Sequence, residues 1–192
     1  MKAQVFIALK FLLGMTILTG IIYPFLMTGI AQVVFPAKAN GSLVVKDGKI
    51  IGSVLIGQKF DSTIYFWSRP SAIDYNPIPS SGSNFGPTSD KLKKQVEERR
   101  ILFATGNSIA DIGSIPKEMI FASGSGLDPH ISPVAAMLQL ERVSKSRNYS
   151  ESQKLLIREL IKNKTEEPQF LLFGEPRINV FELNLALDNI TK

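Results

Sequence analysis

Residues Phe11–Ala37 read FLLGMTILTGIIYPFLMTGIAQVVFPA and contain no charged side chain. As a helix this stretch would be about 40 Å long, whereas the hydrocarbon core of a bilayer is about 30 Å thick. A cleavable secretory signal is the alternative, because Ala37–Ala39 (AKA) resembles a cleavage site. The apolar core of a signal is usually only about 7–15 residues long. The sequence therefore predicts a retained transmembrane helix within residues 1–37.

The orientation of this span is not fixed by its flanking charges. Lys2 and Lys10 precede it, and Lys38, Lys46 and Lys49 follow it, so the positive-inside rule is nearly balanced. A short amino-terminal tail before a much longer domain commonly leaves that domain outside the cell. We therefore expect a single-pass protein with a cytoplasmic amino terminus and one extracytoplasmic domain, residues 38–192.

Small or helix-bending residues recur at every fourth position of the span: Thr16, Gly20, Pro24 and Thr28. Small residues on one helical stripe let a neighbouring helix approach closely. Ordinary composition is the alternative, since glycine and proline are common in membrane helices. The stripe predicts a packing site for another membrane helix.

The larger domain begins with a predicted β-hairpin. Two apolar runs within Ser42–Gly57 flank Asp47-Gly48, a dipeptide that suits a two-residue turn with positive φ. A long loop rich in proline, serine and glycine follows over Tyr65–Pro87. Its aromatic residues Phe66 and Trp67 must be buried against something, so we expect the loop to be ordered.

Helix signals occupy the rest of the domain. They predict helices from the caps at Thr88–Asp90 to about Phe103, from Ser132-Pro133 to about Lys145, and after the Ser150/Gln153 capping box. Residues 179–190 fit either a strand or a helix; Asn179 with Glu182 resembles a capping box and favours the helix. The fold class predicted is α+β, with a β-hairpin or small sheet packed by about four helices.

The amino-acid composition argues against several classes of function. The chain has no cysteine and a single histidine, which excludes thiol chemistry and disfavours a histidine-based zinc site. Its net charge of +5 suggests nucleic-acid binding, but the basic run Lys91–Arg100 is diluted by Glu97 and Glu98. That pattern is typical of a solvated helix rather than of a phosphate-binding patch.

The stretch Phe121–Pro133 (FASGSGLDPHISP) contains serine, aspartate and histidine, the residue types of a hydrolase triad. Pro129 favours an extended chain between Asp128 and His130, and we expect this arrangement to keep Asp128 from orienting His130. The sequence also has no G-x-S-x-G nucleophile motif and no G-x-x-x-x-G-K-[ST] phosphate loop. We therefore interpret this stretch as a structural or interface loop; a membrane-tethered or secreted hydrolase using His130 is the alternative.

Five stretches resemble, in order and spacing, the C subunit family of the Kdp potassium-transporting ATPases. They are IGSVLIGQKF (51–60), YFWSRPSA (65–72), SGSNFGPTS (81–89), ASGSGLDPHISP (122–133) and GEPRINVFELNLALD (174–188). Together with the amino-terminal span, the resemblance covers nearly the whole chain. Each motif alone is weak, but five in order are specific.

The resemblance implies a non-catalytic subunit of an ATP-driven potassium importer in the bacterial inner membrane. Its partners would be a channel-like potassium-binding subunit, a P-type ATPase subunit and a small lipid-like peptide subunit. The family's proposed role is to assist assembly and to raise the nucleotide affinity of the ATPase subunit. The chain would need no cofactor or metal of its own, because the partner ATPase uses the ATP.

The same motifs supply candidate structural or interface residues, with no catalytic residue among them. These candidates are Arg69, Ser83, Asn84, Ser123, Gly124, Gly126, Asp128, His130, Ser132, Glu175 and Arg177. An extracytoplasmic domain cannot reach cytoplasmic ATP, so any effect on nucleotide affinity would be a long-range coupling.

Overall fold

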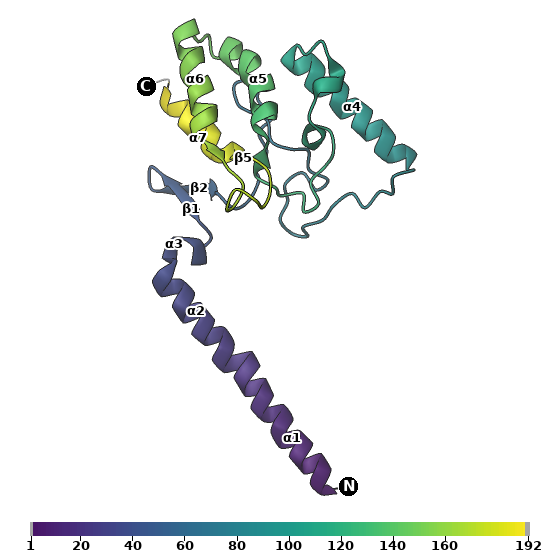
Figure 1. Cartoon of the computed structure of the whole chain (residues 1–192), viewed down its shortest axis with the longest axis vertical. Helices are drawn as coiled ribbons and strands as arrows, with labels where there is room; N and C mark the ends of the chain where they lie inside the picture. Colours follow the sequence, from purple (N-terminus) through teal and green to yellow (C-terminus); the bar gives the residue numbers. More distant parts are fainter. Residues whose placement is uncertain (1, 191–192) are drawn as a thin grey trace. The chain divides into compact units, whose positions relative to one another are not determined.

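A computed structural model describes residues 2–190 of the chain. The chain divides into two compact units, Met1–Ser53 and Val54–Lys192. The first contains an apolar helix and a hairpin, and the second contains further helices around a small sheet (Figure 1). The predicted α+β class is confirmed.

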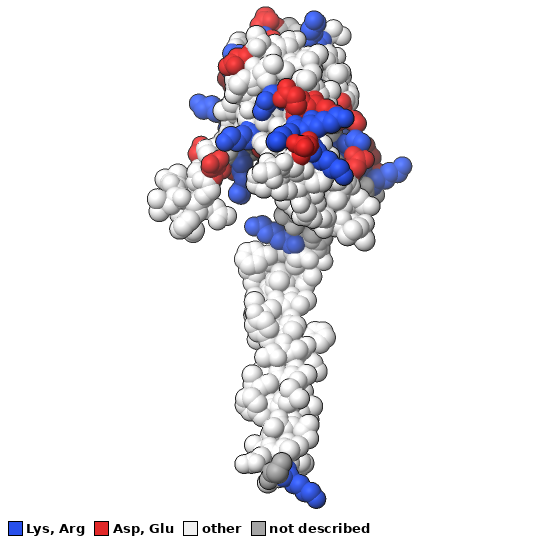
Figure 2. Space-filling model, turned by 90° about the vertical axis from the view of Figure 1, so that its right-hand side faces the viewer, with Lys and Arg blue, Asp and Glu red and all other residues white. Residues whose placement is uncertain are grey.

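The apolar helix runs through three consecutive segments: α1 (Lys2–Ile17), the π-helical η1 (Leu18–Ile22) and α2 (Tyr23–Val34). With 33 residues, Lys2–Val34 is long and apolar enough to cross a membrane by length and composition. Figure 2 shows most of this helix as a white shaft, with a blue side chain near its end. The short helix α3 (Pro36–Ala39) follows.

Pro24 explains the π-helical segment. A proline inside a helix lacks an amide donor, and its ring clashes with the carbonyl four residues earlier, which here belongs to Gly20 within η1. In an α-helix, every-fourth positions drift by about 40° per step around the axis. The wider π turn reduces this drift, so it keeps Thr16, Gly20 and Pro24 closer to one line than an unbroken α-helix would.

The predicted hairpin is confirmed. Strands β1 (Leu43–Lys46) and β2 (Lys49–Ser53) pair antiparallel, with a register shift between Val44 and Val45. Asp47 and Gly48 have φ values of 51° and 74°, as a two-residue turn of this kind requires. These strands form a sheet of their own. The hairpin therefore groups with the apolar helix, whereas the boundary expected from the sequence lay after residue 37.

Four α-helices in the described part of the second unit correspond to the predicted ones. They are α4 (Asp90–Asn107), α5 (Pro133–Ser146), α6 (Glu151–Asn163) and α7 (Val180–Ile190). Ser89, Ser132 and Ser150 each accept a hydrogen bond from the amide three residues later, and Ser150 forms the full capping box. Helix α4 continues one turn beyond the expected end at Phe103 and stops at Ser108, which is left-handed. The choice of a helix for residues 180–190 is confirmed.

A three-stranded antiparallel sheet completes this unit, in the order β3-β5-β4. Its strands are β3 (His130–Ile131), β4 (Thr165–Glu166) and β5 (Arg177–Asn179). Ile178 of β5 pairs with both Ile131 and Thr165. Such short strands carry no alternating pattern, so the sequence did not predict them. Two 3₁₀ turns, η2 (Ile112–Ser114) and η3 (Lys117–Met119), connect α4 to the following loop.

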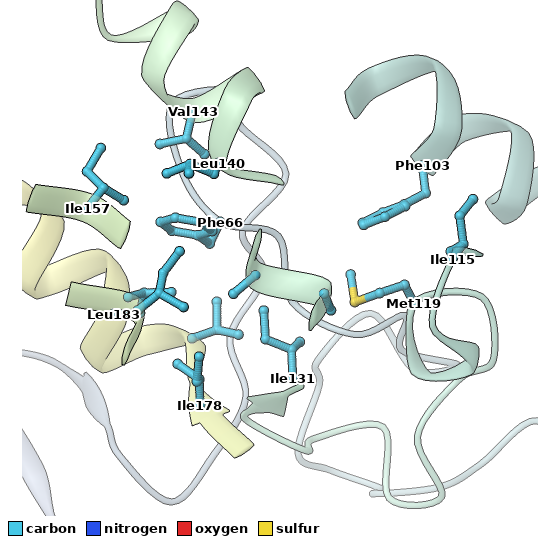
Figure 3. Packing of buried hydrophobic residues seen from close by; sticks show 14 of the residues in the cluster. Phe66, Phe103, Ile115, Met119, Ile131, Leu140, Val143, Ile157, Ile178 and Leu183 are labelled. Atoms are coloured by element: carbon cyan, nitrogen blue, oxygen red, sulfur yellow. The ribbon is translucent and has the colours of Figure 1, made fainter. Parts of the chain in front are cut away.

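The long loop Tyr65–Pro87 is anchored in the core by Phe66, which is fully buried. Figure 3 shows its ring among Leu140, Val143, Ile157 and Leu183, from helices α5, α6 and α7. Phe103, Ile115 and Met119 extend the same core towards α4 and η3. The expectation that the loop buries its aromatic residues is confirmed for Phe66, whereas Trp67 is half-buried against the core.

Buried amide side chains take the place of a neighbouring strand along this loop. Asn184 accepts from the Phe66 amide at 2.9 Å and donates to its carbonyl at 3.0 Å. Gln139 accepts from the Trp67 amide at 2.7 Å and donates to its carbonyl at 3.4 Å. Buried peptide groups need such partners, so two side chains satisfy a loop that has no ladder of its own.

Candidate functional site

Six of the candidate residues from the sequence line one pocket of about 340 Å³. They are Arg69, Asp128, His130, Ser132, Glu175 and Arg177, and the pocket wall also contains Glu118, Ile131 and Pro176. The pocket thus gathers motifs that lie far apart along the chain. Its walls carry charges of both signs.

The three-stranded sheet brings these motifs together. His130 lies opposite Asn179, so the DPH segment runs beside the strand that begins at Arg177. On the other side of β5, Arg177 pairs with Glu166 both in the ladder and through an ion pair of 3.0 Å. The turn η3 adds Glu118, whose Oε1 accepts from the Ser132 amide at 3.3 Å.

Asp128 is the hub of the pocket's hydrogen bonds. Its Oδ2 accepts from the Arg69 guanidinium at 2.5 Å, and its Oδ1 accepts from the His130 amide at 3.0 Å. The same Oδ1 lies 3.2 Å from His130 Nδ1. The expectation that Pro129 would keep Asp128 from orienting His130 is therefore wrong. Residues two apart in an extended chain lie on the same face, and an aspartate readily folds back onto the amide two residues later, so an extended chain at Pro129 does not separate the two side chains.

The Asp128 carboxyl titrates at an unusually low pH. Burial raises its pKa, but the hydrogen bonds from His130 and the charge and hydrogen bond of Arg69 outweigh burial and lower the pKa to about 2. A carboxylate that accepts several hydrogen bonds is stabilised in its charged form. Asp128 is thus an anion that holds Arg69 and the DPH segment in place.

We expect Asp128→Asn to make the protein's stability less dependent on pH. The pKa of Asp128 lies below its unfolded value of about 3.9, so its contribution is complete above about pH 4 and is lost as pH falls towards 2. Because the carboxylate is 30% exposed, we expect a loss of about 1–2 kcal/mol at pH 7. Unfolding of the full chain in detergent, followed by the fluorescence of its single tryptophan, Trp67, measures this.

The matched control is Asp74→Asn, which removes an exposed carboxylate paired with Lys59 at 2.8 Å. Exposed ion pairs contribute little, so its free energy of unfolding should stay within about 0.5 kcal/mol of the parent's. An Asp128→Asn variant that stays as stable as the parent from pH 2 to pH 7 would contradict the assigned role.

The other candidates shape loops outside the pocket. Ser123 is buried and its amide donates to the Pro70 carbonyl at 3.1 Å. Gly126 has φ +72° and lies against Ile73, whereas Gly124 is exposed with open space at its Cβ position. Ser83 is half-buried, and Asn84 is exposed with φ 53°. Of this group, Ser123 and Gly126 make close packing or backbone contacts.

The polar side chains of the pocket are hydrogen-bonded to one another and to the backbone. Among the described residues, the His130 ring is hydrogen-bonded to Asp128. The Ser132 hydroxyl caps α5 by accepting from the Ala135 amide. No serine hydroxyl in residues 2–190 is hydrogen-bonded to His130, so no nucleophile–base pair is formed there. Residues 2–190 also contain no cluster of three or more metal-ligating side chains.

Two contributors to the site were missed in the sequence. Glu118 gave no signal, because it belongs to none of the five stretches and to no predicted helix or strand. Gly57 donates its amide to the Leu127 carbonyl at 2.7 Å, and a Cβ there would lie 2.7 Å from the Asp128 carbonyl oxygen. Its place in the IGQKF stretch was the available signal, since a glycine often marks a close backbone approach.

Comparison with known protein families identifies the family of this chain. A model of the KdpC family, described as the c chain of K⁺-transporting ATPases, matches residues 5–189. The chain belongs to the KdpC family. This match covers the span, the hairpin and the pocket, so the resemblance of the five stretches is confirmed.

Curated KdpC relatives are similar over almost their whole length. The potassium-transporting ATPase KdpC subunit of Methylococcus capsulatus is 50% identical over 187 residues, 94% of this chain and 95% of the relative. That of Geobacter metallireducens is 48% identical over 188 residues, 95% and 96% of the two chains. That of Dechloromonas aromatica is 44% identical over 195 residues and covers both chains completely.

Proposed function

We propose that this chain is a non-catalytic subunit of an ATP-driven potassium import complex. The match of a KdpC family model to residues 5–189 supports this most strongly. In this proposal its partners are a channel-like potassium-binding subunit, a P-type ATPase subunit and a small membrane peptide. It assists their assembly and raises the affinity of the ATPase subunit for ATP.

The coupling to ATP is indirect in this proposal. We place the amino terminus in the cytoplasm and the second unit outside, anchored by Lys2–Val34 in the bacterial inner membrane. ATP then lies across the membrane from the pocket, so an effect on its affinity must pass through the complex. Protease added to intact spheroplasts should digest the second unit; protection of that unit would contradict this topology.

The affinity claim is tested on the purified complex with and without this chain. We expect the ATP concentration for half-maximal ATPase activity to rise several-fold when the chain is omitted. A His130→Ala complex should keep most of its ATPase rate per complex, because His130 is held by Asp128 as part of a loop. Normal assembly with abolished turnover in that variant would instead favour the catalytic role of His130.

The small-residue stripe is proposed as the contact of the span with another membrane helix. A Cβ at Gly20 meets nothing within 4 Å in the isolated chain, so Gly20→Leu should insert normally but weaken co-purification with the membrane subunits. Gly14→Leu is the matched control, since Gly14 is equally open and lies off the stripe. Equal co-purification of the two variants would show that the stripe makes no helix contact and that the span serves only to anchor the chain in the membrane.

A further inference from the structure

The loop between β4 and β5 exposes four consecutive apolar side chains. Phe170, Leu171, Leu172 and Phe173 are 86%, 80%, 80% and 67% exposed. We call residues 170–173 the apolar tip; its loop is drawn in yellow-green between α6 and β5 (Figure 1). Scattered single apolar residues are normal on a surface, but a contiguous group marks a contact site.

Backbone hydrogen bonds close the turn that carries the apolar tip. Gln169 and Phe173 exchange two backbone hydrogen bonds of 2.9 Å, and the Leu171 amide donates to the Pro168 carbonyl at 2.9 Å. Phe170 and Leu171 have φ values of 54° and 60°, a region that side chains with a Cβ rarely adopt. This turn therefore carries backbone strain without burying its own side chains, which points to a role outside the chain.

The charges around the apolar tip favour a protein over a lipid surface. Glu167 and Glu175 flank it, both exposed and without an ion pair among residues 2–190. No lysine, arginine, tryptophan or tyrosine lies between Thr165 and Pro176. Loops that enter bilayers use such residues at the interface, and anionic lipids repel carboxylates.

We propose that the apolar tip is a docking anchor that inserts into an apolar, basic-rimmed cavity on another subunit of the transport complex. Aromatic side chains in desolvated cavities dominate binding energies at protein interfaces, and a preordered turn loses little entropy on docking. Glu175, which follows the tip by two residues, also lines the charged pocket, so the pocket begins close to the tip along the chain. This inference rests on the proposed function, because it requires a partner subunit.

The first test replaces both strained residues with asparagine, Phe170→Asn together with Leu171→Asn. Asparagine tolerates positive φ, so the variant should fold as stably as the parent or better. We expect its co-purification with the ATPase complex to fall at least tenfold. The matched control is Ile101→Gln with Leu102→Gln on α4, which removes apolar side chains that are 54% and 65% exposed; it should co-purify normally.

Each outcome of this test has a distinct meaning. If the parent chain co-purifies and the double asparagine variant does so equally well, the docking anchor is wrong and the proposed function stands. If the α4 control loses as much binding as the variant, general apolar surface rather than the tip is responsible, and the inference is overturned. If the parent chain itself finds no ATPase partners, the proposed function and the inference fall together.

A second measurement separates a protein cavity from lipid. The chain has no cysteine, so Leu171→Cys gives one thiol for a small environment-sensitive fluorophore. In vesicles of zwitterionic and anionic phospholipid, the full-length chain alone should give water-like emission that brominated lipids do not quench. Emission should shift to the blue when the partner subunits are added. Quenching by brominated lipid in the absence of partners would show membrane insertion instead and overturn the proposal.

Discussion

Replacing Arg142 with methionine is expected to lower the free energy of unfolding by about 3–4 kcal/mol. Arg142 is only 7% exposed and holds the long loop against α4 and α5. Its guanidinium donates to Thr63 and Tyr65 carbonyls at 2.5 and 3.0 Å, and to the Asn107 and Gln139 side chains at 2.8 Å each. Its plane also covers the Trp67 ring at 4.1 Å.

The sign of this effect follows from two opposing contributions. Burial lowers the Arg142 pKa to about 10, because removing the guanidinium from water disfavours its charged form. Hydrogen bonds from a charged donor contribute about 1.5–3 kcal/mol each, and Arg142 makes four. The favourable hydrogen bonds therefore outweigh the loss of solvation. Methionine fills similar space but leaves four oxygen acceptors without this donor.

Urea unfolding of the full chain in detergent, followed by far-ultraviolet circular dichroism, measures the loss. Arg142→Lys should be intermediate, because an ammonium keeps the charge but cannot reproduce the planar fork. Arg158→Met on the exposed face of α6 is the matched control and should change stability by less than about 0.5 kcal/mol. An Arg142→Met variant as stable as the control would show that this network does not hold the loop.

Gly126→Ala is expected to destabilise the second unit by about 2–4 kcal/mol. Gly126 has φ +72°, and a Cβ there would lie 2.5 Å from Ile73 Cγ1 and 3.0 Å from the Ser81 carbonyl oxygen. The substitution thus combines an unfavourable backbone conformation with a clash between two packed loops. The midpoint of urea unfolding reports this loss.

Gly124→Ala provides a control two residues away in the same GSG sequence. Gly124 has no atom within 4 Å of its Cβ position and no positive φ. Its substitution should therefore change the free energy of unfolding by less than about 0.5 kcal/mol. Equal losses of stability for the two variants would show that neither the positive φ nor the close contacts of Gly126 determine the cost of a side chain in this loop.

Local signals in the sequence were sufficient for the helices and the hairpin. Ser89, Ser132 and Ser150 cap helices as predicted, because a cap depends on residues within one turn. Asp47-Gly48 fixed the hairpin turn for the same reason. The apolar helix followed from length and charge alone.

Local signals of this kind could not predict the contacts between residues far apart in the sequence. The pairing of His130 with Asn179, and of Thr165 with Ile178, joins strands of two or three residues that have no periodicity. The expectation for the Asp128–His130 contact was wrong, because residues two apart in an extended chain share one face and the aspartate side chain also folds back onto the His130 amide. The role of Arg142 was also hidden, since a charged residue on a helix is normally solvated. The shared pocket of the family motifs emerged only from the fold.

The most direct test of the proposed potassium-pump function is a pull-down of the tagged chain from membranes of potassium-starved cells, with identification of the captured proteins. We predict that a P-type ATPase subunit and a channel-like potassium-binding subunit are captured together with the chain in stoichiometric amounts. Recovery of the chain alone, without any large membrane partner, would contradict the proposed function.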